Sequence, residues 1–389
     1  MNERQLLMIP GPIAFDPAVL RVLSTPTDSH VSPEFIEIFG QALDDMLKVF
    51  LAPNGQPFVV AGSGTLAMEL GLANLVEPGD RVLVLQTGVF GERFSDIARR
   101  QGAVVDEIIA PLGDAPDAAA VEKKLASASY KVMTVTYVDT STGVAADVKR
   151  LGELARKHGA LFVVDGVCAT AGMECQQEAW GVDVYLTASQ KAIAVPPGLA
   201  LLVASERAIQ AFRSRKTLVP SYYADWGKWL PIMEAYRQRK PAYFGTPAVN
   251  LIYALQVSLK QILAEGMDAR FARHKRLSDG FKAAAQALGL RQVPARPEVA
   301  AHTLSAVYYP EGVDAALLKK MAEEGVIVAG GLHPEIRTRY FRVGHMGPAA
   351  PSDILATVGA LERGLAALGH PVELGRGVEA AQREMGKSN

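Results

Sequence analysis

The first half of the chain alternates short apolar runs, rich in β-branched residues, with longer stretches of helical period. This alternation predicts strands separated by helices, and therefore a mostly parallel sheet with helices on both faces. The stretch 147–158 has the helical period, because Val148, Leu151 and Leu154 fall on one face and its charged side chains fall mainly on the other. The predicted strands lie at 58–60, 82–85, 132–138, 161–164, 184–186 and 199–203.

The pattern changes after about residue 205. An aromatic-rich segment at 222–243 leads into a long helical stretch over 250–288. The elements expected beyond it are strands at 305–309, 326–328 and 340–343, a helix at 314–324 and helices from 353 onward. We expect an N-terminal segment at 1–20, a large α/β domain at 21–278 with a mostly parallel mixed sheet, and a smaller C-terminal α+β domain at 279–389.

Composition narrows the possible partners. The 389 residues include 40 Lys and Arg against 41 Asp and Glu, which gives a formal net charge of −1. This balance provides no field for holding nucleic acid or an anionic membrane surface, so the expected partners are small molecules and other protein chains. The longest mainly apolar stretch, 192–204, contains Pro196 and Pro197 and is shorter than the ~20 residues that span a bilayer.

Cysteine and histidine usage points away from metal and disulfide chemistry. The two cysteines, Cys168 and Cys175, have a spacing that matches neither a CxxC redox pair nor a zinc ligand pair. So few cysteines are typical of a reducing compartment, and we expect a cytoplasmic protein. The seven histidines contain no HxxxH or HExxH pattern, so no metal site is predicted.

A glycine-rich element at 61–65 (AGSGT) follows a predicted strand and opens an apolar helix. It would present backbone N–H groups, the positive end of a helix dipole and the hydroxyls of Ser63 and Thr65 to a phosphate. A plain tight turn with a helix N-cap is an open alternative. A dinucleotide fingerprint is another, weakened because Gln86 and Thr87 stand where an acid would bind ribose.

An acid and a lysine each follow a predicted strand. Asp165 follows the strand at 161–164, and Lys191 lies beyond the strand at 184–186. Asp165 alone could simply cap a helix. Together with the cup at 61–65, however, the two residues supply what pyridoxal phosphate requires, since a lysine amine binds its aldehyde and a carboxylate keeps its ring nitrogen protonated. All three groups are expected at one edge of the sheet.

With these motifs the chain resembles the class V, fold-type I aminotransferases, and among them the alanine–glyoxylate subgroup. The Asp-to-Lys spacing is shared across the class, and the Ser-Thr-Gly, Tyr-Phe-x-Thr-Pro and Arg-x-Gly-His-Met-Gly elements narrow the likeness to the subgroup. The resemblance implies a pyridoxal-phosphate enzyme that is a homodimer. The matching segments are 9–12, 30–35, 61–65, 139–143, 164–165, 189–191, 243–247 and 342–347.

The resemblance also implies roles for individual residues. Lys191 would bind the cofactor covalently and move the substrate proton, and Asp165 would contact the ring nitrogen. Val167 and Phe90 would pack on opposite ring faces, where many relatives have Trp in place of Phe90. The other positions matched to the cofactor are Ser63, Gly64, Thr65, Ser141 with Thr142 as a close alternative, Gln190 and, from the neighbouring subunit, Tyr243 and Thr246.

On the substrate side, the resemblance assigns Arg342 to the substrate carboxylate, with Gly11 and Ser141 nearby. A guanidinium fork fits a carboxylate with two parallel hydrogen bonds. Judged from the residues alone, some of these positions have plainer interpretations. Arg342 could be a salt-bridge residue in a strand, Phe90 a core aromatic, and Thr246 a helix N-cap followed by proline.

The reaction that the resemblance implies is transfer of the amino group of a small L-amino acid, alanine first and serine second, to glyoxylate, which gives glycine and a 2-oxo acid. Pyridoxamine–pyruvate, serine–pyruvate and serine–glyoxylate transamination are alternatives within the family. A non-catalytic or nucleotide-binding α/β protein is the alternative from a different class. Cysteine desulfurase chemistry is disfavoured because neither cysteine lies in the C-terminal third.

Overall fold

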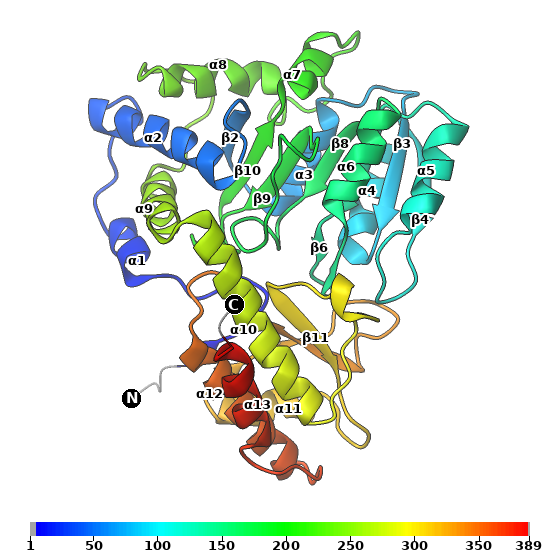
Figure 1. Ribbon diagram of the computed structural model, residues 1–389. Helices are drawn as coiled ribbons and strands as arrows, with labels where there is room; N and C mark the ends of the chain where they lie inside the picture. Colours follow the sequence, from blue (N-terminus) through cyan, green and yellow to red (C-terminus); the bar gives the residue numbers. More distant parts are fainter. Residues whose placement is uncertain (1–4, 388–389) are drawn as a thin grey trace.

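The computed structural model describes residues 5–387, and its larger part is built on one seven-stranded sheet (Figure 1). The order along the sheet is β2-β10-β9-β8-β5-β3-β4. Only β10 runs antiparallel to its neighbours, so the prediction of a mostly parallel mixed sheet is confirmed. The strands are β2 (Gln56–Ala61), β3 (Arg81–Gln86), β4 (Val104–Ile109), β5 (Val132–Thr136), β8 (Leu161–Asp165), β9 (Val184–Ala188) and β10 (Leu199–Ala204).

Helices cover this sheet, and its central strands are buried at every position. That burial explains why these strands have continuous apolar sequences rather than alternating ones. A short hairpin of β6 (Val138–Asp139) and β7 (Val144–Ala145) follows β5. The helices of this part are α1 (Pro17–Leu23), α2 (Pro33–Val49), α3 (Gly64–Ala73), α4 (Val89–Arg100), α5 (Ala118–Ser127), α6 (Val148–Lys157), α7 (Glu206–Arg213), α8 (Trp226–Arg237) and α9 (Val249–Glu265).

A second, smaller part has its own apolar core, formed around residues such as Phe281, Leu317 and Phe341. Helix α10 (Met267–Ala287) reaches down into it from the larger part (Figure 1). An antiparallel sheet of order β11-β14-β13 lies here, and β1 (Leu6–Leu7) pairs in parallel with β12. Its elements are β11 (Leu304–Tyr308), β12 (Val326–Ile327), β13 (Ala329–Gly330), β14 (Tyr340–Gly344), α11 (Ala316–Glu323), α12 (Pro351–Ala367), α13 (Arg376–Met385) and the 3₁₀ turn Pro297–Val299.

Several elements differ from the sequence-based expectation. The predicted strand at 132–138 is divided into β5, which ends at Thr136, and β6, which begins at Val138 and belongs to the short hairpin. The helical stretch at 250–288 is two helices, because Gly266 adopts φ +82° and breaks the path between α9 and α10. Strand β4 was not predicted, since it lies at the sheet edge and is only partly buried. The aromatic segment contains helix α8, which has Pro231 in its interior. The domain boundaries at residues 20 and 278 remain predictions.

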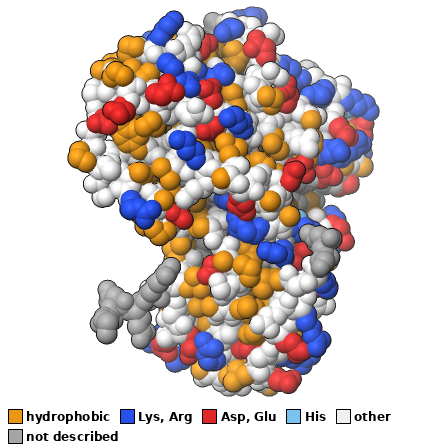
Figure 2. All heavy atoms as spheres, turned by 60° about the vertical axis from the view of Figure 1, so that its left-hand side comes forward, with side chains coloured by type: hydrophobic (Ala, Val, Ile, Leu, Met, Phe, Trp, Pro, Cys, Tyr) orange, Lys and Arg blue, Asp and Glu red, His pale blue; other side chains and the backbone are white. Residues whose placement is uncertain are grey.

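The surface matches the balanced charge of the sequence. Figure 2 shows acidic and basic side chains interspersed over the visible face, without a large patch of one sign. Within residues 5–387, no helix is long and apolar enough to cross a membrane. The same residues contain no group of three or more His, Cys, Asp or Glu side chains that could hold a metal ion.

Candidate active site

The predicted phosphate cup, Asp165 and Lys191 follow strands that run in the same direction. Strands β2, β8 and β9 are mutually parallel, so their C-terminal ends meet at one edge of the sheet. The cup is close to the other two strand ends, because a Cβ added at Gly64 would lie 3.2 Å from Val167 Cγ2 and 3.3 Å from the Ala188 Cβ. The structure thus brings together the three motifs selected from the sequence.

The cup is open to an anion. Ser63 occupies the N-cap position of α3, but its side chain forms no cap hydrogen bond. The plain N-cap interpretation is therefore wrong for this hydroxyl, which is available to a ligand together with the N–H groups of the first turn. The side-chain oxygen of Gln190 is buried with no hydrogen-bond partner within residues 5–387. Thr65 is partly engaged, since its hydroxyl accepts a hydrogen bond from Arg93 Nη1 at 2.9 Å.

Asp165 is a buried carboxyl at the end of β8. It does not cap a helix, because a series of turns follows it and its Oδ1 accepts from the Val167 N–H at 2.8 Å. Burial raises the pKa of Asp165 to about 7, the Val167 N–H opposes this, and the neighbouring Asp139 carboxyl adds to the rise. The positive charges of Arg93 and Lys191 act in the opposite direction. A carboxyl so poised can hold or release a proton near neutral pH.

Lys191 is buried against the N-terminal segment. Its Nζ donates a hydrogen bond to the Pro10 carbonyl, and the Ile13 N–H donates to the Gln190 carbonyl at 3.2 Å. Gly11 adopts φ +126°, and a Cβ there would lie 2.6 Å from Lys191 Cδ and 2.8 Å from Nζ. Only glycine fits this conformation and this approach. Gly11 therefore borders the Lys191 amine, and its assignment to the substrate side remains a prediction.

Ser141 is held by Asp139, a residue for which no role was predicted. Asp139 is fully buried, and its Oδ1 accepts hydrogen bonds from Ser141 Oγ at 2.5 Å and Ser141 N at 2.8 Å, while its Oδ2 accepts from Phe90 N at 3.1 Å. Burial raises the pKa of Asp139, and these hydrogen bonds oppose the rise. The Asp-x-Ser sequence is typical of such local turns and could have identified Asp139. Thr142 instead donates to the Thr87 carbonyl at 3.1 Å.

Phe90 is only half-buried, so it is not an ordinary core aromatic. The guanidinium carbon of Arg93 lies 4.9 Å from the centre of its ring. Because the two residues are three positions apart in α4, they share a helix face. Arg93 was not predicted as a site residue, although its helical spacing from Phe90 could have indicated it.

Arg342 lies in β14 and points toward the loop after β6. Its Nε donates to the Gly330 carbonyl at 2.9 Å and its Nη1 to the Thr140 carbonyl at 3.2 Å. No carboxylate within residues 5–387 forms an ion pair with it, so the salt-bridge interpretation is wrong. Burial lowers the pKa of the guanidinium. Its remaining N–H groups are available to a substrate carboxylate.

Tyr243 and Thr246 lie on the surface. The Tyr243 side chain is 64% exposed and its ring centre is 5.2 Å from that of His30. Thr246 is not a helix N-cap, because α9 begins at Val249 with Ala248 as its N-cap. In the described part of the chain, no hydrogen bond joins either residue to the cup of the same subunit.

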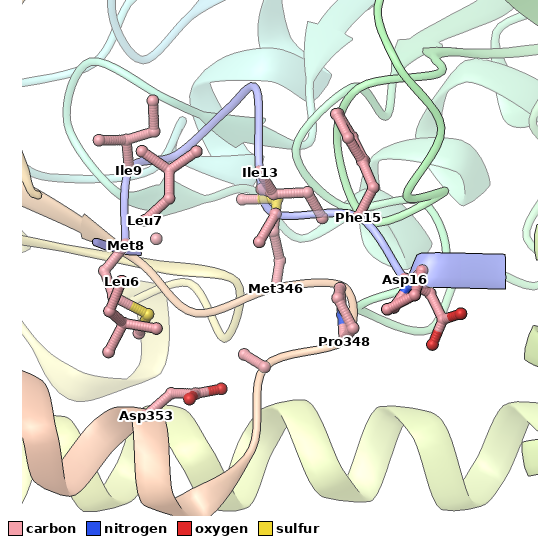
Figure 3. A pocket seen from close by; sticks show the side chains of 14 residues that line it. Leu6, Leu7, Met8, Ile9, Ile13, Phe15, Asp16, Met346, Pro348 and Asp353 are labelled. Carbon is pink, nitrogen blue, oxygen red and sulfur yellow. The ribbon is translucent and has the colours of Figure 1, made fainter. Parts of the chain in front are cut away.

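A cavity of about 190 Å³ borders the N-terminal segment. Figure 3 shows Ile13 and Phe15 above it, together with Asp353 of α12 below. It runs between segments 6–17 and 344–353, and none of the residues predicted for the active site lines it. The cavity is therefore separate from the site around Lys191.

The residues around Lys191 fit pyridoxal phosphate. The uncapped end of α3 suits the phosphate, Lys191 suits the aldehyde, and Asp165 suits the ring nitrogen. Gly64 is also needed, because a larger residue there would press against Val167, on which the ring is expected to pack. The fit rests on chemically distinct groups at one edge of the sheet rather than on any single residue.

Comparison with known proteins points to one family. The family model described as aminotransferase class-V matches residues 21–346. Alanine–glyoxylate aminotransferase 1 of Saccharomyces cerevisiae is 41% identical over 358 residues, which are 88% of this chain and 92% of that protein. L-aspartate–glyoxylate aminotransferase of Paracoccus denitrificans is 34% identical over 388 residues, 98% of this chain and 96% of that protein. The crystal structure of pyridoxamine–pyruvate aminotransferase from Mesorhizobium loti has a TM-score of 0.92 at 31% identity and covers 98% of this chain and 97% of that one.

Proposed function

This chain belongs to the class V aminotransferases, which depend on pyridoxal phosphate, and from that premise we propose that it transfers the amino group of a small L-amino acid to glyoxylate. Alanine is the proposed donor, with serine second, and glycine and a 2-oxo acid are the products. The observation that carries the proposal is Arg342, a partly buried guanidinium without an ion-pair partner in the described chain, beside the loop that holds Ser141. The names of the yeast and Paracoccus relatives support glyoxylate as the acceptor.

Different residues of the chain would carry out the separate parts of the proposed reaction. When bound, pyridoxal phosphate supplies an aldehyde that reacts with amines and a ring that withdraws electrons. Lys191, freed by the incoming amino acid, would move the α-proton as a general base and then a general acid. Asp165 would share a proton with the ring nitrogen, to which its pKa of about 7 is suited. Arg342 would orient the substrate carboxylate, and Phe90 and Val167 would confine the ring.

We also propose a homodimer whose sites include residues of both copies. Support comes from Tyr243 and Thr246, which match cofactor contacts of the family but are exposed in the single chain. We further propose that the protein is cytoplasmic and that its reaction contributes to the formation of glycine. Two free, buried cysteines, Cys168 and Cys175, agree with a reducing compartment.

A matrix of amino donors and 2-oxo acceptors tests the proposed reaction. The expected result is the highest kcat/KM for alanine with glyoxylate. The kcat/KM for serine should be lower by no more than about 200-fold, since one hydroxyl or methyl group changes pocket binding by only ~1–3 kcal/mol. Preference for pyruvate with pyridoxamine or with serine would contradict it. The open, uncapped cup argues against free pyridoxamine as the substrate, because pyridoxamine carries no phosphate.

Replacing Arg342 with lysine should raise KM for the amino acid and the 2-oxo acid alike by roughly 10–100-fold. An ammonium group cannot reproduce the paired hydrogen bonds of the guanidinium, and each charged hydrogen bond contributes about 1.5–3 kcal/mol. Steady-state kinetics with each substrate varied in turn provides the measurement. Arg296→Lys, an exposed arginine paired with Asp114, is the matched control. An unchanged KM in the Arg342 variant would mean that another group binds the carboxylate.

A further inference from the structure

Strand β14 touches the Ser141 loop at two consecutive carbonyls. Tyr340 and Arg342 are two positions apart in the strand and therefore face the same side of the small sheet. The Tyr340 hydroxyl donates a hydrogen bond to the Ser141 carbonyl, and Arg342 Nη1 donates to the Thr140 carbonyl at 3.2 Å. The expected substrate arginine and Tyr340 are therefore anchored side by side on one loop of the large domain.

The Tyr340 hydroxyl also binds the backbone of the segment 332–333, which precedes β14. It accepts hydrogen bonds from the backbone N–H groups of Leu332 at 2.8 Å and His333 at 2.9 Å. Tyr340 is fully buried, so its hydroxyl uses its donor and both of its acceptor positions inside the protein. A Cβ added at Gly331 would lie 2.5 Å from Tyr340 Cε1, which shows how closely this segment packs on the ring.

The contacts continue from Ser141 into the cofactor site. The Ser141 hydroxyl and N–H both donate to Asp139, and Asp139 also accepts from the Phe90 N–H. One side chain of the small domain thus reaches, through Ser141 and Asp139, the aromatic residue expected on the ring face. No comparable hydrogen bond is made by Tyr308, which pairs with Tyr340 across the sheet but whose hydroxyl has no partner within residues 5–387.

We propose that Tyr340 is a positioning residue that holds the Arg342 guanidinium at a fixed distance from the Ser141 loop and so sets where the substrate carboxylate binds relative to the cofactor. The inference rests on the proposed function and deepens it. Tyr340→Phe keeps the buried ring but removes the hydroxyl, which leaves the Leu332 and His333 N–H groups without their acceptor. The variant keeps the Arg342 guanidinium, but it loses the Tyr340 hydroxyl that fixes strand β14 against the Ser141 loop.

In the holoenzyme, Tyr340→Phe should raise KM for the amino acid and for the 2-oxo acid by roughly 5–20-fold, because part of the cost of losing the three hydrogen bonds of this hydroxyl falls on substrate binding, and should lower kcat by less than about threefold. The affinity for propionate, a carboxylate without an amino group, should fall by the same factor. The dissociation constant of pyridoxal phosphate and the cooperativity of melting should not change. Tyr308→Phe, the control, should match wild type in every measurement.

Unchanged KM and propionate affinity in Tyr340→Phe would overturn the proposal. A parallel loss of cofactor affinity, or loss of cooperative melting, would overturn it as well, since the hydroxyl would then have a general structural role. Failure of the proposed function can be distinguished from failure of this inference. If the proposed function is wrong, the wild-type protein itself will not transfer an amino group between any tested donor and acceptor. Propionate binding would still test Tyr340 in that case.

Discussion

Replacing Lys191 with alanine is expected to lower kcat by about 10²–10⁴-fold, while the protein still binds pyridoxal phosphate. The loss follows because the Lys191 amine is the group that we propose moves the substrate proton, and positioned proton transfer contributes a factor of this size. The cup at Ser63 and the carboxyl of Asp165 are untouched, so non-covalent binding should persist. Single-turnover and steady-state kinetics, with absorbance of the cofactor after gel filtration, measure both effects.

Lys260→Ala is the matched control for this experiment, since Lys260 is exposed on α9. It should keep wild-type turnover and visible absorbance. Near wild-type kcat in Lys191→Ala would exclude Lys191 as the proton carrier. Loss of all cofactor binding would instead mean that the cup and Asp165 contribute little affinity of their own.

Replacing Asp165 with asparagine should have opposite effects on stability and catalysis. Burial raises the pKa of Asp165 from 3.8 to about 7 in the folded, cofactor-free protein. Its favourable contribution to stability is fully present below pH 3.8 and is lost as the pH rises through about 7. A difference of about 3 in pKa corresponds to about 4 kcal/mol. Asparagine stays neutral, so the cofactor-free variant should be the more stable protein at pH 8, with the gap closing toward pH 4.

Catalysis should change the other way, because asparagine cannot balance the charge of a protonated ring nitrogen. We expect kcat to fall by roughly 10²–10³-fold, the size of a lost preorganised electrostatic contact. Urea unfolding of the cofactor-free proteins from pH 4 to pH 8 and steady-state kinetics provide the measurements. Asp268→Asn, an exposed carboxyl on α10, should show neither effect. A stability gap that does not vary with pH would contradict the raised pKa of Asp165.

The parts of the site that could be predicted lie next to strands with clear apolar patterns. Asp165, Lys191 and the cup at 61–65 each follow a buried strand, so their order along the chain already places them at one edge of a parallel sheet. Membership in the class V aminotransferases excludes the non-catalytic and nucleotide-binding alternative. The cup also fits a dinucleotide fingerprint. The absence of an acid at Gln86 and Thr87 correctly favoured a phosphate cup over a dinucleotide site.

The missed residues act through contacts that local patterns do not contain. Tyr340 bonds to Ser141 across 199 positions of sequence, and nothing near Tyr340 indicates that partner. Arg93 interacts with Thr65, which lies on another helix. Strand β4 was missed for a different reason, because an edge strand is partly solvated and its apolar pattern is weaker. Side-chain pairing between distant segments, rather than secondary structure, accounts for most of what the sequence could not provide.

Covalent attachment of pyridoxal phosphate at Lys191 is the most direct test of the proposed chemistry. The purified protein would be incubated with pyridoxal phosphate, reduced with borohydride, digested and examined by mass spectrometry. We predict a yellow protein whose visible absorbance disappears on reduction, with the added mass on the peptide that contains Lys191 and on no other lysine peptide. A protein that stays colourless with pyridoxal phosphate, or a label on a different lysine, would contradict it.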